Sequence, residues 1–269
     1  MSDRKHALKD MTSAEFRLRM AEKPVILLPF GSQEVQGPHA PMGDFMLTEA
    51  VALMVAKAAD AVAAPTMPFG HADFFRAIPG GIALRTQTFI GVVEDIANGF
   101  LDHGLDHLVI LNGHTTNAPL IDQAVRQIRR ARGVVIPSIN LWQSIAPELW
   151  QKLHGGDAAK ARGHGGDPLT SIYLYLFPEL MRPDLAVRPA LGKAFGLPTA
   201  GVSALTHGDL TVQVPLNVDE VDVNGVMGGD FALSSAAKGA AMVEHIVTRT
   251  AAFTRHFRAC DPHRIDMVP

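Results

Sequence analysis

Cysteine and long apolar runs are scarce in this chain. Cys260 is the single cysteine among 269 residues, so no disulfide can form within the chain, and a reducing compartment is expected. No stretch reaches the about 18 uncharged apolar residues that a membrane span needs. The first 16 residues are charged throughout and lack the apolar core of a signal peptide. The sequence therefore predicts a cytoplasmic protein without a membrane partner.

The chain also lacks the features of a nucleic-acid or nucleotide binder. Its net charge is -3 with a pI near 6.4, and Lys and Arg form no run. A basic face of the kind that neutralises phosphates is therefore not expected. Neither a G-x-G-x-x-G fingerprint nor a P-loop is present. The sequence therefore predicts neither a nucleic-acid nor a nucleotide partner.

What the chain does contain is an alternation of apolar runs and amphipathic segments. With 47% apolar residues it can form one large domain over residues 1–269, and no repeat or linker divides it. Helices at 170–177 and 234–257 and a strand at 212–216 are expected in the second half. In the first half the predicted strands cover 25–28, 62–67 and 107–111, and a fourth strand begins at 134–136. The predicted helices there cover 48–61, 88–103 and 117–130. This order predicts an α/β fold with a mostly parallel sheet and helices on both faces.

Side chains with metal-binding chemistry follow several of these strands. Because ligands bind beyond the carboxyl ends of parallel strands, the loops there are the place to look. Glu34 and Asp44 follow the first strand, His71 the second and His114 the third. Carboxylates with imidazole suit Zn, Mn or Fe(II). No H-E-x-x-H or paired C-x-x-C occurs, so spacing alone leaves a metal site open.

Five segments, in order, resemble the signatures of one family. They are LPFGSQEVQGPHAPMGD at 28–44, IPGGIAL at 78–84, NGHTTN at 112–117, HGGDPLTS at 164–171 and GD with AAKG within 229–239. Together they resemble the creatininase (creatinine amidohydrolase) family. The resemblance implies an α/β fold, one or two divalent metals at the carboxyl edge of the sheet, and a homo-oligomer, often a hexamer.

Carried over position by position, the resemblance makes Glu34, Asp44 and His114 metal ligands. Asp167 stands where family members place a further carboxylate ligand. His164 stands beside the substrate as a proton carrier, so His164 and Glu34 are the expected catalytic residues. Asp44 and Asp167 could instead cap the helices that follow them, and His114 could bind a carbonyl group.

Several positions depart from the family pattern. Gln36 replaces a metal-binding histidine, Thr116 a ligating glutamate and Leu169 another glutamate. These changes predict one ion per subunit, with zinc as the first choice and manganese or iron as alternatives. We expect Gln36, His71, Thr116 and Trp142 to contact the substrate.

The expected function is a metal-dependent hydrolase that acts on a small cyclic amide or formamide. A divalent ion would activate water and polarise the carbonyl group, and His164 would carry a proton. Two alternatives remain open at this point. One is hydrolytic ring opening of a cyclic ketone or diketone, such as an oxidised inositol, by C–C cleavage. The other is a non-catalytic, ligand-binding homologue.

Overall fold

A four-stranded parallel sheet lies at the centre of the molecule, in the order β2-β1-β3-β4. The computed structural model describes residues 4–190 and 192–265. Every residue of β1 and β3 is buried, as expected for strands covered on both faces. The bounds are Ile26–Phe30 for β1, Val62–Ala63 for β2, Leu108–Asn112 for β3 and Ser138–Asn140 for β4.

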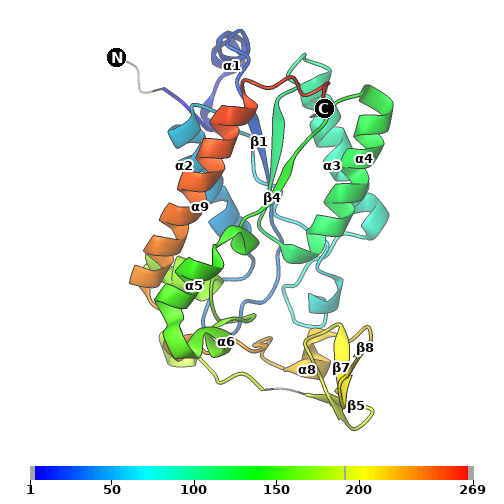
Figure 1. Cartoon of the computed structure of the whole chain (residues 1–269), viewed down its shortest axis with the longest axis vertical. Helices are drawn as coiled ribbons and strands as arrows, with labels where there is room; N and C mark the ends of the chain where they lie inside the picture. Colours follow the sequence, from blue (N-terminus) through cyan, green and yellow to red (C-terminus); the bar gives the residue numbers. More distant parts are fainter. Residues whose placement is uncertain (1–3, 191, 266–269) are drawn as a thin grey trace.

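Helices cover both faces of this sheet (Figure 1), which confirms the predicted layers. On one face lie α2 (Phe45–Ala59) and α9 (Ala236–Phe257), and on the other α3 (Thr86–Leu101) and α4 (Ala118–Arg132). Successive strand residues point to opposite faces, so each strand contributes to two cores. Leu27 packs with the α2 and α9 side, and Leu28 with the α3 and α4 side.

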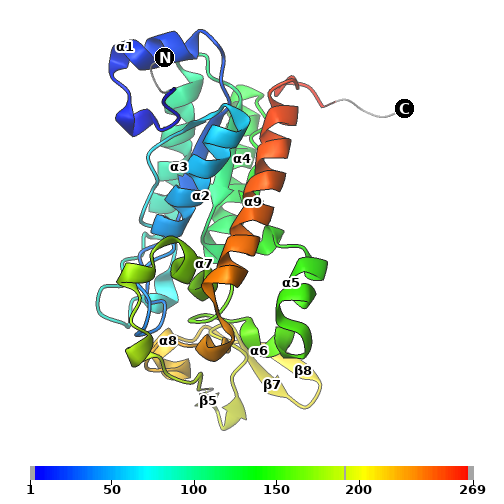
Figure 2. The same cartoon turned by 90° about the vertical axis from the view of Figure 1, so that its left-hand side faces the viewer.

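The other elements are shorter, and most of them gather at the end of the molecule farthest from α1 (Figure 2). The remaining helices are α1 Ser13–Met20, α5 Pro147–His154, α6 Ala158–Ala161, α7 Leu169–Leu176 and α8 Val218–Val221. The remaining strands are β5 Lys193–Ala194, β6 Leu197–Pro198, β7 Ala204–His207 and β8 Leu210–Gln213. Single 3-10 turns cover Leu8–Asp10, Asp73–Phe75, Thr115–Asn117, Trp142–Ser144, Gly155–Asp157, Pro178–Leu180, Pro183–Leu185 and Phe231–Leu233.

Two strands differ from the sequence-based expectation. The fourth strand begins at Ser138, because the segment expected from 134 binds elsewhere: the N–H of Val135 donates to the carbonyl of Pro262. The ladder to β3 starts only when Ile110 donates to the carbonyl of Pro137. The second strand ends at Ala63 instead of reaching residue 67, and only an isolated bridge joins Met67 to β1.

The late strand expected at 212–216 is also placed differently. It is β8, which ends at Gln213 and pairs with β7 as an antiparallel hairpin around Gly208. Within the described ranges, no helix has the length and apolar character needed to cross a bilayer.

Candidate metal centre

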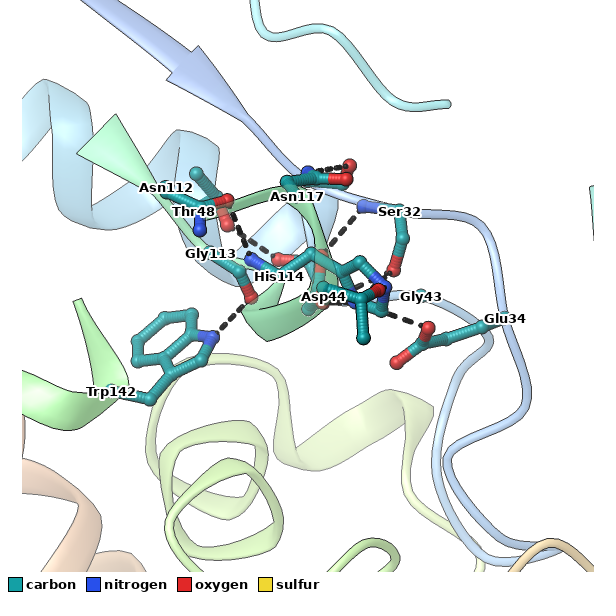
Figure 3. Close-up of polar contacts among 12 residues, drawn as sticks. Ser32, Glu34, Gly43, Asp44, Thr48, Asn112, Gly113, His114, Asn117 and Trp142 are labelled. Atoms are coloured by element: carbon teal, nitrogen blue, oxygen red, sulfur yellow. Dashed lines mark hydrogen bonds and ion pairs between the residues drawn. The ribbon is translucent and has the colours of Figure 1, made fainter. Parts of the chain in front are cut away.

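Two neighbouring strand ends bring together the three residues expected to bind a metal. Glu34 and Asp44 lie in the segment that leaves β1, and His114 follows β3. Because Phe30 is in register with Asn112, the two loops start side by side. One ligand atom of each of the three residues lies within 4.8 Å of the others, and all three residues are buried. Figure 3 shows the three side chains converging on one point.

The spacing of these atoms fits a shared cation. Nδ1 of His114 lies 3.0 Å from Oδ2 of Asp44 and 3.1 Å from Oε2 of Glu34. Oε2 of Glu34 is buried and makes no hydrogen bond with any described residue. Two ligands that each lie about 2.1 Å from a cation, at 90 to 110° to one another, are about 3.0 to 3.4 Å apart. Two carboxylates and an imidazole at this spacing can therefore hold a divalent ion.

The carboxylates are oriented by neighbouring side chains of the same loop. Asp44 stands at the N-cap position of α2 but makes no capping hydrogen bond. Its Oδ1 accepts from the N–H of Ser32 at 2.7 Å, and the Ser32 hydroxyl lies 3.1 Å from Oδ2. The amide Nε2 of Gln36 donates to Oε1 of Glu34 at 2.8 Å. The structure therefore gives Asp44 no capping role and turns its carboxylate into the cluster.

The imidazole of His114 is held on its other side by Thr116. The Thr116 hydroxyl donates its one proton to the carbonyl of His71, so towards Nε2 of His114, at 2.6 Å, it acts as an acceptor. Nε2 therefore carries a proton. Nδ1 then faces two carboxylates, which requires either a second proton or a cation at Nδ1.

The ionisation of the cluster follows from burial and mutual charge. Burial opposes charge on His114, but Glu34 and Asp44 outweigh it and raise the pKa of the imidazole to about 10 in the absence of a cation. Burial raises the pKa of Asp44 to about 6, against the opposing effect of His114. For Glu34 burial also opposes ionisation, yet the charge on His114 dominates and the pKa of Glu34 is lowered.

Close backbone packing supports the loop that carries His114. A Cβ on Gly113 would lie 1.7 Å from the hydroxyl oxygen of Thr48 in α2, so only glycine fits there. Nε1 of Trp142 donates to the carbonyl of Gly113 (Figure 3). Trp142 is thereby fixed as a wall of the site.

The three donors open into a cavity of about 490 Å³. Three of the expected substrate contacts, Gln36, Thr116 and Trp142, line it. The second half of the chain supplies much of the remaining wall, through residues 162–164, 167–169 and 200–203 and Met227, and Phe74 and Phe75 add to it from the first half. The elements beyond the sheet edge thus form the far side of the cavity.

His164 also lines the cavity, as expected for a residue beside a substrate. Its Nε2 lies 2.6 Å from the carbonyl of Val35, and its ring stacks on Phe75 with centroids 4.5 Å apart. Donation to that carbonyl places the proton on Nε2 and leaves Nδ1 as an acceptor. Burial lowers the pKa of His164, although the charge of Glu34 opposes this. His164 is thus neutral and oriented.

Asp167 is not brought into the group of three donors. Its Oδ1 accepts from the N–H of Ser171 at 3.0 Å and from the hydroxyl of Ser234 at 2.6 Å, and its Oδ2 accepts from the Ser171 hydroxyl at 2.7 Å. Asp167 therefore joins the first turn of α7 to the segment before α9. It reaches the cavity wall, but its oxygens are occupied by these hydrogen bonds.

His71 lies behind Thr116, outside the cavity lining. Its Nδ1 is 3.3 Å from the carbonyl of Leu84, and its N–H donates to Oδ1 of Asn117 at 2.8 Å. Asn117 stands at the N-cap position of α4, but its side chain makes no capping hydrogen bond and binds this N–H and the carbonyl of Gly31. The backbone of His71, and not its imidazole, is what connects it to the site.

Three residues near the site were given no role from the sequence. Ser32 lies in the first signature segment, but nothing in the pattern indicated that it contacts both Asp44 and His114. Phe75 and Arg162 come from loops without a periodic pattern, and both line the cavity. No local signal in the sequence could have identified them.

Known proteins with similar sequences are hydrolases. The chain is 31% identical over 193 residues to creatinine amidohydrolase of Pseudomonas putida, covering 66% of this chain and 74% of that protein. It is 28% identical over 181 residues to 3-dehydro-scyllo-inosose hydrolase of Thermotoga maritima, covering 66% of this chain but only 58% of that protein.

The fold is also similar to that of solved structures. A structure described as "Creatininase Mn" superimposes with a TM-score of 0.76 at 26% identity, covering 94% of this chain and 98% of the other. The family model for creatinine amidohydrolase matches residues 9–254, which include the whole cluster and most of the cavity wall. The chain therefore belongs to the creatininase family.

Proposed function

We propose that this protein is a metal-dependent hydrolase that attacks the carbonyl group of a small cyclic amide or formamide with water. The observation that carries the proposal is the convergence of Glu34, Asp44 and His114 on one point at the base of a cavity. A divalent ion at that point would lower the pKa of a water molecule and polarise a carbonyl group. We propose one ion per subunit, zinc first and manganese or iron as alternatives.

The donor set supports a single ion. Glu34, Asp44 and His114 supply three ligand atoms. Gln36 offers an amide where the family resemblance places a metal-binding histidine, and its nitrogen donates to Glu34. Asp167 remains a possible fourth donor only if it exchanges its serine partners for the ion, so we assign it a structural part in this proposal.

The chain's own residues supply the proton transfer and the orientation. Neutral His164, with Nδ1 as acceptor, is suited to take a proton from attacking water and to pass it to the leaving nitrogen. Glu34 is held by Gln36, and Asp44 by Ser32, so neither carboxylate has to reorganise during the reaction. Trp142 and Phe75 give the cavity apolar walls beside the reacting group.

Hydrolytic ring opening of a cyclic ketone is a second candidate. It is favoured by one observation, the 28% identity to 3-dehydro-scyllo-inosose hydrolase. The same groups would serve, because water attack on a ring carbonyl has the same charge development in both reactions. The two candidates differ only in the bond that breaks, C–N or C–C.

Metal analysis and a substrate screen test the proposal. We expect about one equivalent of zinc, manganese or iron in the purified protein, lost on His114→Ala. A screen of lactams, formamides and cyclic ketones with added Mn or Zn should give hydrolysis in one class, lowered at least about 100-fold by His164→Gln. A wild-type protein that binds small ligands but no metal would instead support the non-catalytic homologue.

The assembly and location are further parts of the proposal. By family resemblance we propose a homo-oligomer, a hexamer, located in the cytoplasm. Light scattering on the purified protein and fractionation of the source cells test these two points.

A further inference from the structure

We propose that Arg162 is an anion-binding position of the cavity, so that the substrate carries a carboxylate or a phosphate ester beside its reacting carbonyl group. The inference deepens the proposed function and rests on it. It concerns the chemistry of the substrate, which the three donors at the base of the cavity leave undefined.

The charge distribution in the cavity is the first argument. Arg162 is the one lysine or arginine among the residues that line the cavity. Three carboxylates line it as well, but none of them pairs with Arg162: Glu34 and Asp44 face His114, and the oxygens of Asp167 accept from Ser171 and Ser234. The guanidinium therefore has no carboxylate partner among the residues that line the cavity.

The free donors of Arg162 are the second argument. Its side chain makes no hydrogen bond or ion pair with the residues that the structure describes. It is held instead by its face, with Cζ 4.0 Å from the ring centroid of Trp150. Trp150 is buried and fixed by donation from Nε1 to the carbonyl of Ala158 at 3.0 Å. Stacking orients the planar group but uses none of its five N–H donors, which suit a carboxylate or a phosphate.

The position of Arg162 in the chain is the third argument. It stands two residues before His164, and the backbone of this segment is anchored. The N–H of Gly163 donates to the carbonyl of Asp167 at 3.2 Å, and that of His164 to the carbonyl of Met227 at 3.0 Å. A cation and a proton carrier are thus supplied by one fixed turn. An anionic group bound at Arg162 would hold the rest of the molecule beside His164.

The proposed metal centre does not oppose an anionic substrate. The two carboxylates of Glu34 and Asp44 balance the charge of a divalent ion, so the base of the cavity has no net negative charge once the ion is bound. The remaining carboxylate of the lining, Asp167, is buried and directs its oxygens at Ser171 and Ser234, so the guanidinium is the charged group with free donors that a substrate meets. With a neutral substrate, the guanidinium of Arg162 would have no anionic partner in the cavity.

Matched pairs of compounds with and without the anionic group test the inference. Suitable pairs are 5-oxoproline with 5-oxoprolinamide, N-formylglycine with N-formylglycinamide, and N-formylphosphoethanolamine with N-formylethanolamine. Binding to the metal-loaded protein is measured by calorimetry, or as kcat/KM where a compound is hydrolysed. We expect the charged member of at least one pair to bind about 10-fold tighter or more. The pair with the largest preference distinguishes carboxylate from phosphate.

Variants attribute the preference to Arg162. Arg162→Gln should remove it, and Arg162→Lys should keep part of it, because lysine retains the charge without the planar fork. Lys160→Gln is the matched control: Lys160 is exposed, pairs with Asp157 at 3.2 Å and does not line the cavity, so the preference should persist. All three variants should bind as much metal as the wild type.

Three results would overturn the inference. They are equal binding of both members in every pair, binding of no charged compound at all, and a preference that survives Arg162→Gln. A failure of the proposed function looks different, because the wild-type protein would then take up no stoichiometric metal.

Discussion

The hydroxyl of Thr116 lies 2.6 Å from Nε2 of His114 and fixes which ring nitrogen faces the carboxylates. With Nε2–H donated to Thr116, Nδ1 is left for a cation. Groups that orient a ligating histidine in this way contribute to metal affinity through the geometry they impose.

Removal of that hydroxyl should weaken metal binding. We expect Thr116→Val to raise the Kd for zinc about 10- to 100-fold, because the imidazole loses its orienting acceptor. Competition with a chromophoric chelator measures this. Thr115→Val is the matched control, since Thr115 also lines the cavity but makes no such contact, and it should bind zinc as the wild type does. An equal loss of zinc affinity in the two variants would show that the hydrogen bond between Thr116 and His114 does not contribute to metal binding.

Metal binding should release a proton. Without a cation the pKa of His114 is raised from 6.5 to about 10, so at pH 7 to 8 the imidazole is protonated and must lose a proton when Nδ1 binds the ion. Calorimetry of zinc binding in buffers of different ionisation enthalpy should report close to one proton released per ion. His164→Gln should release the same amount, because the lowered pKa of His164 keeps that residue neutral. Binding without proton release would contradict the ionisation described for the cluster.

The raised pKa of His114 also makes the stability of the metal-free protein depend on pH. The folded-state pKa of His114 lies above its unfolded value of 6.5, so the stabilisation from its charged form is complete below pH 6.5. It is lost as the pH rises towards 10. The free energy of unfolding of the metal-free protein, measured with denaturant, should therefore be lower at pH 9.5 than at pH 6.5. The difference between the two pH values should be smaller in His114→Ala.

Loss of the Gln36 amide should destabilise the fold. Gln36→Leu removes the donor to the buried Oε1 of Glu34, and an unsatisfied buried acceptor costs about 1–3 kcal/mol. Urea unfolding of the metal-free protein measures the change. Gln143→Leu is the control, because Gln143 lines the same cavity but is exposed, and its free energy of unfolding should change little. A similar loss in both variants would mean that the amide of Gln36 does not hold Glu34.

Gly113→Ala should also destabilise the protein, by steric conflict. The added Cβ would lie 1.7 Å from the Thr48 hydroxyl oxygen, and overpacking of this kind costs about 1–3 kcal/mol. Gly113→Ala combined with Thr48→Ala should recover part of the loss in a thermal melt. Gly99→Ala in α3 meets no atom within 4 Å and should be neutral or stabilising, because alanine favours helix. An equally stable Gly113→Ala variant would contradict the close packing seen here.

The sequence predicted the central sheet because β1 and β3 are short apolar runs buried on both faces, and such runs are visible locally. It placed β4 too early because Val134 and Ile136 are apolar whether they form a strand or only pack beneath one. The grouping of Glu34, Asp44 and His114 followed from the strand-edge rule and the signature segments. Arg162 and Phe75 could not be predicted, because their position depends on how distant loops meet.

The signature segment alone does not reveal what the oxygens of Asp167 bind. An aspartate before α7 looks the same in sequence whether its oxygens bind an ion or two serines. Ser171 is part of the signature segment and Ser234 comes from 67 residues away. Only the three-dimensional arrangement shows that both serines are within reach.

The pairing of β1 with β3 decides when the ion can be taken up. Asp44 and His114 are 70 residues apart, and they meet only because their strands are in register at Phe30 and Asn112. An unfolded or half-synthesised chain holds the donors too far apart to chelate anything. We therefore expect the cation to bind only after β1 and β3 have paired.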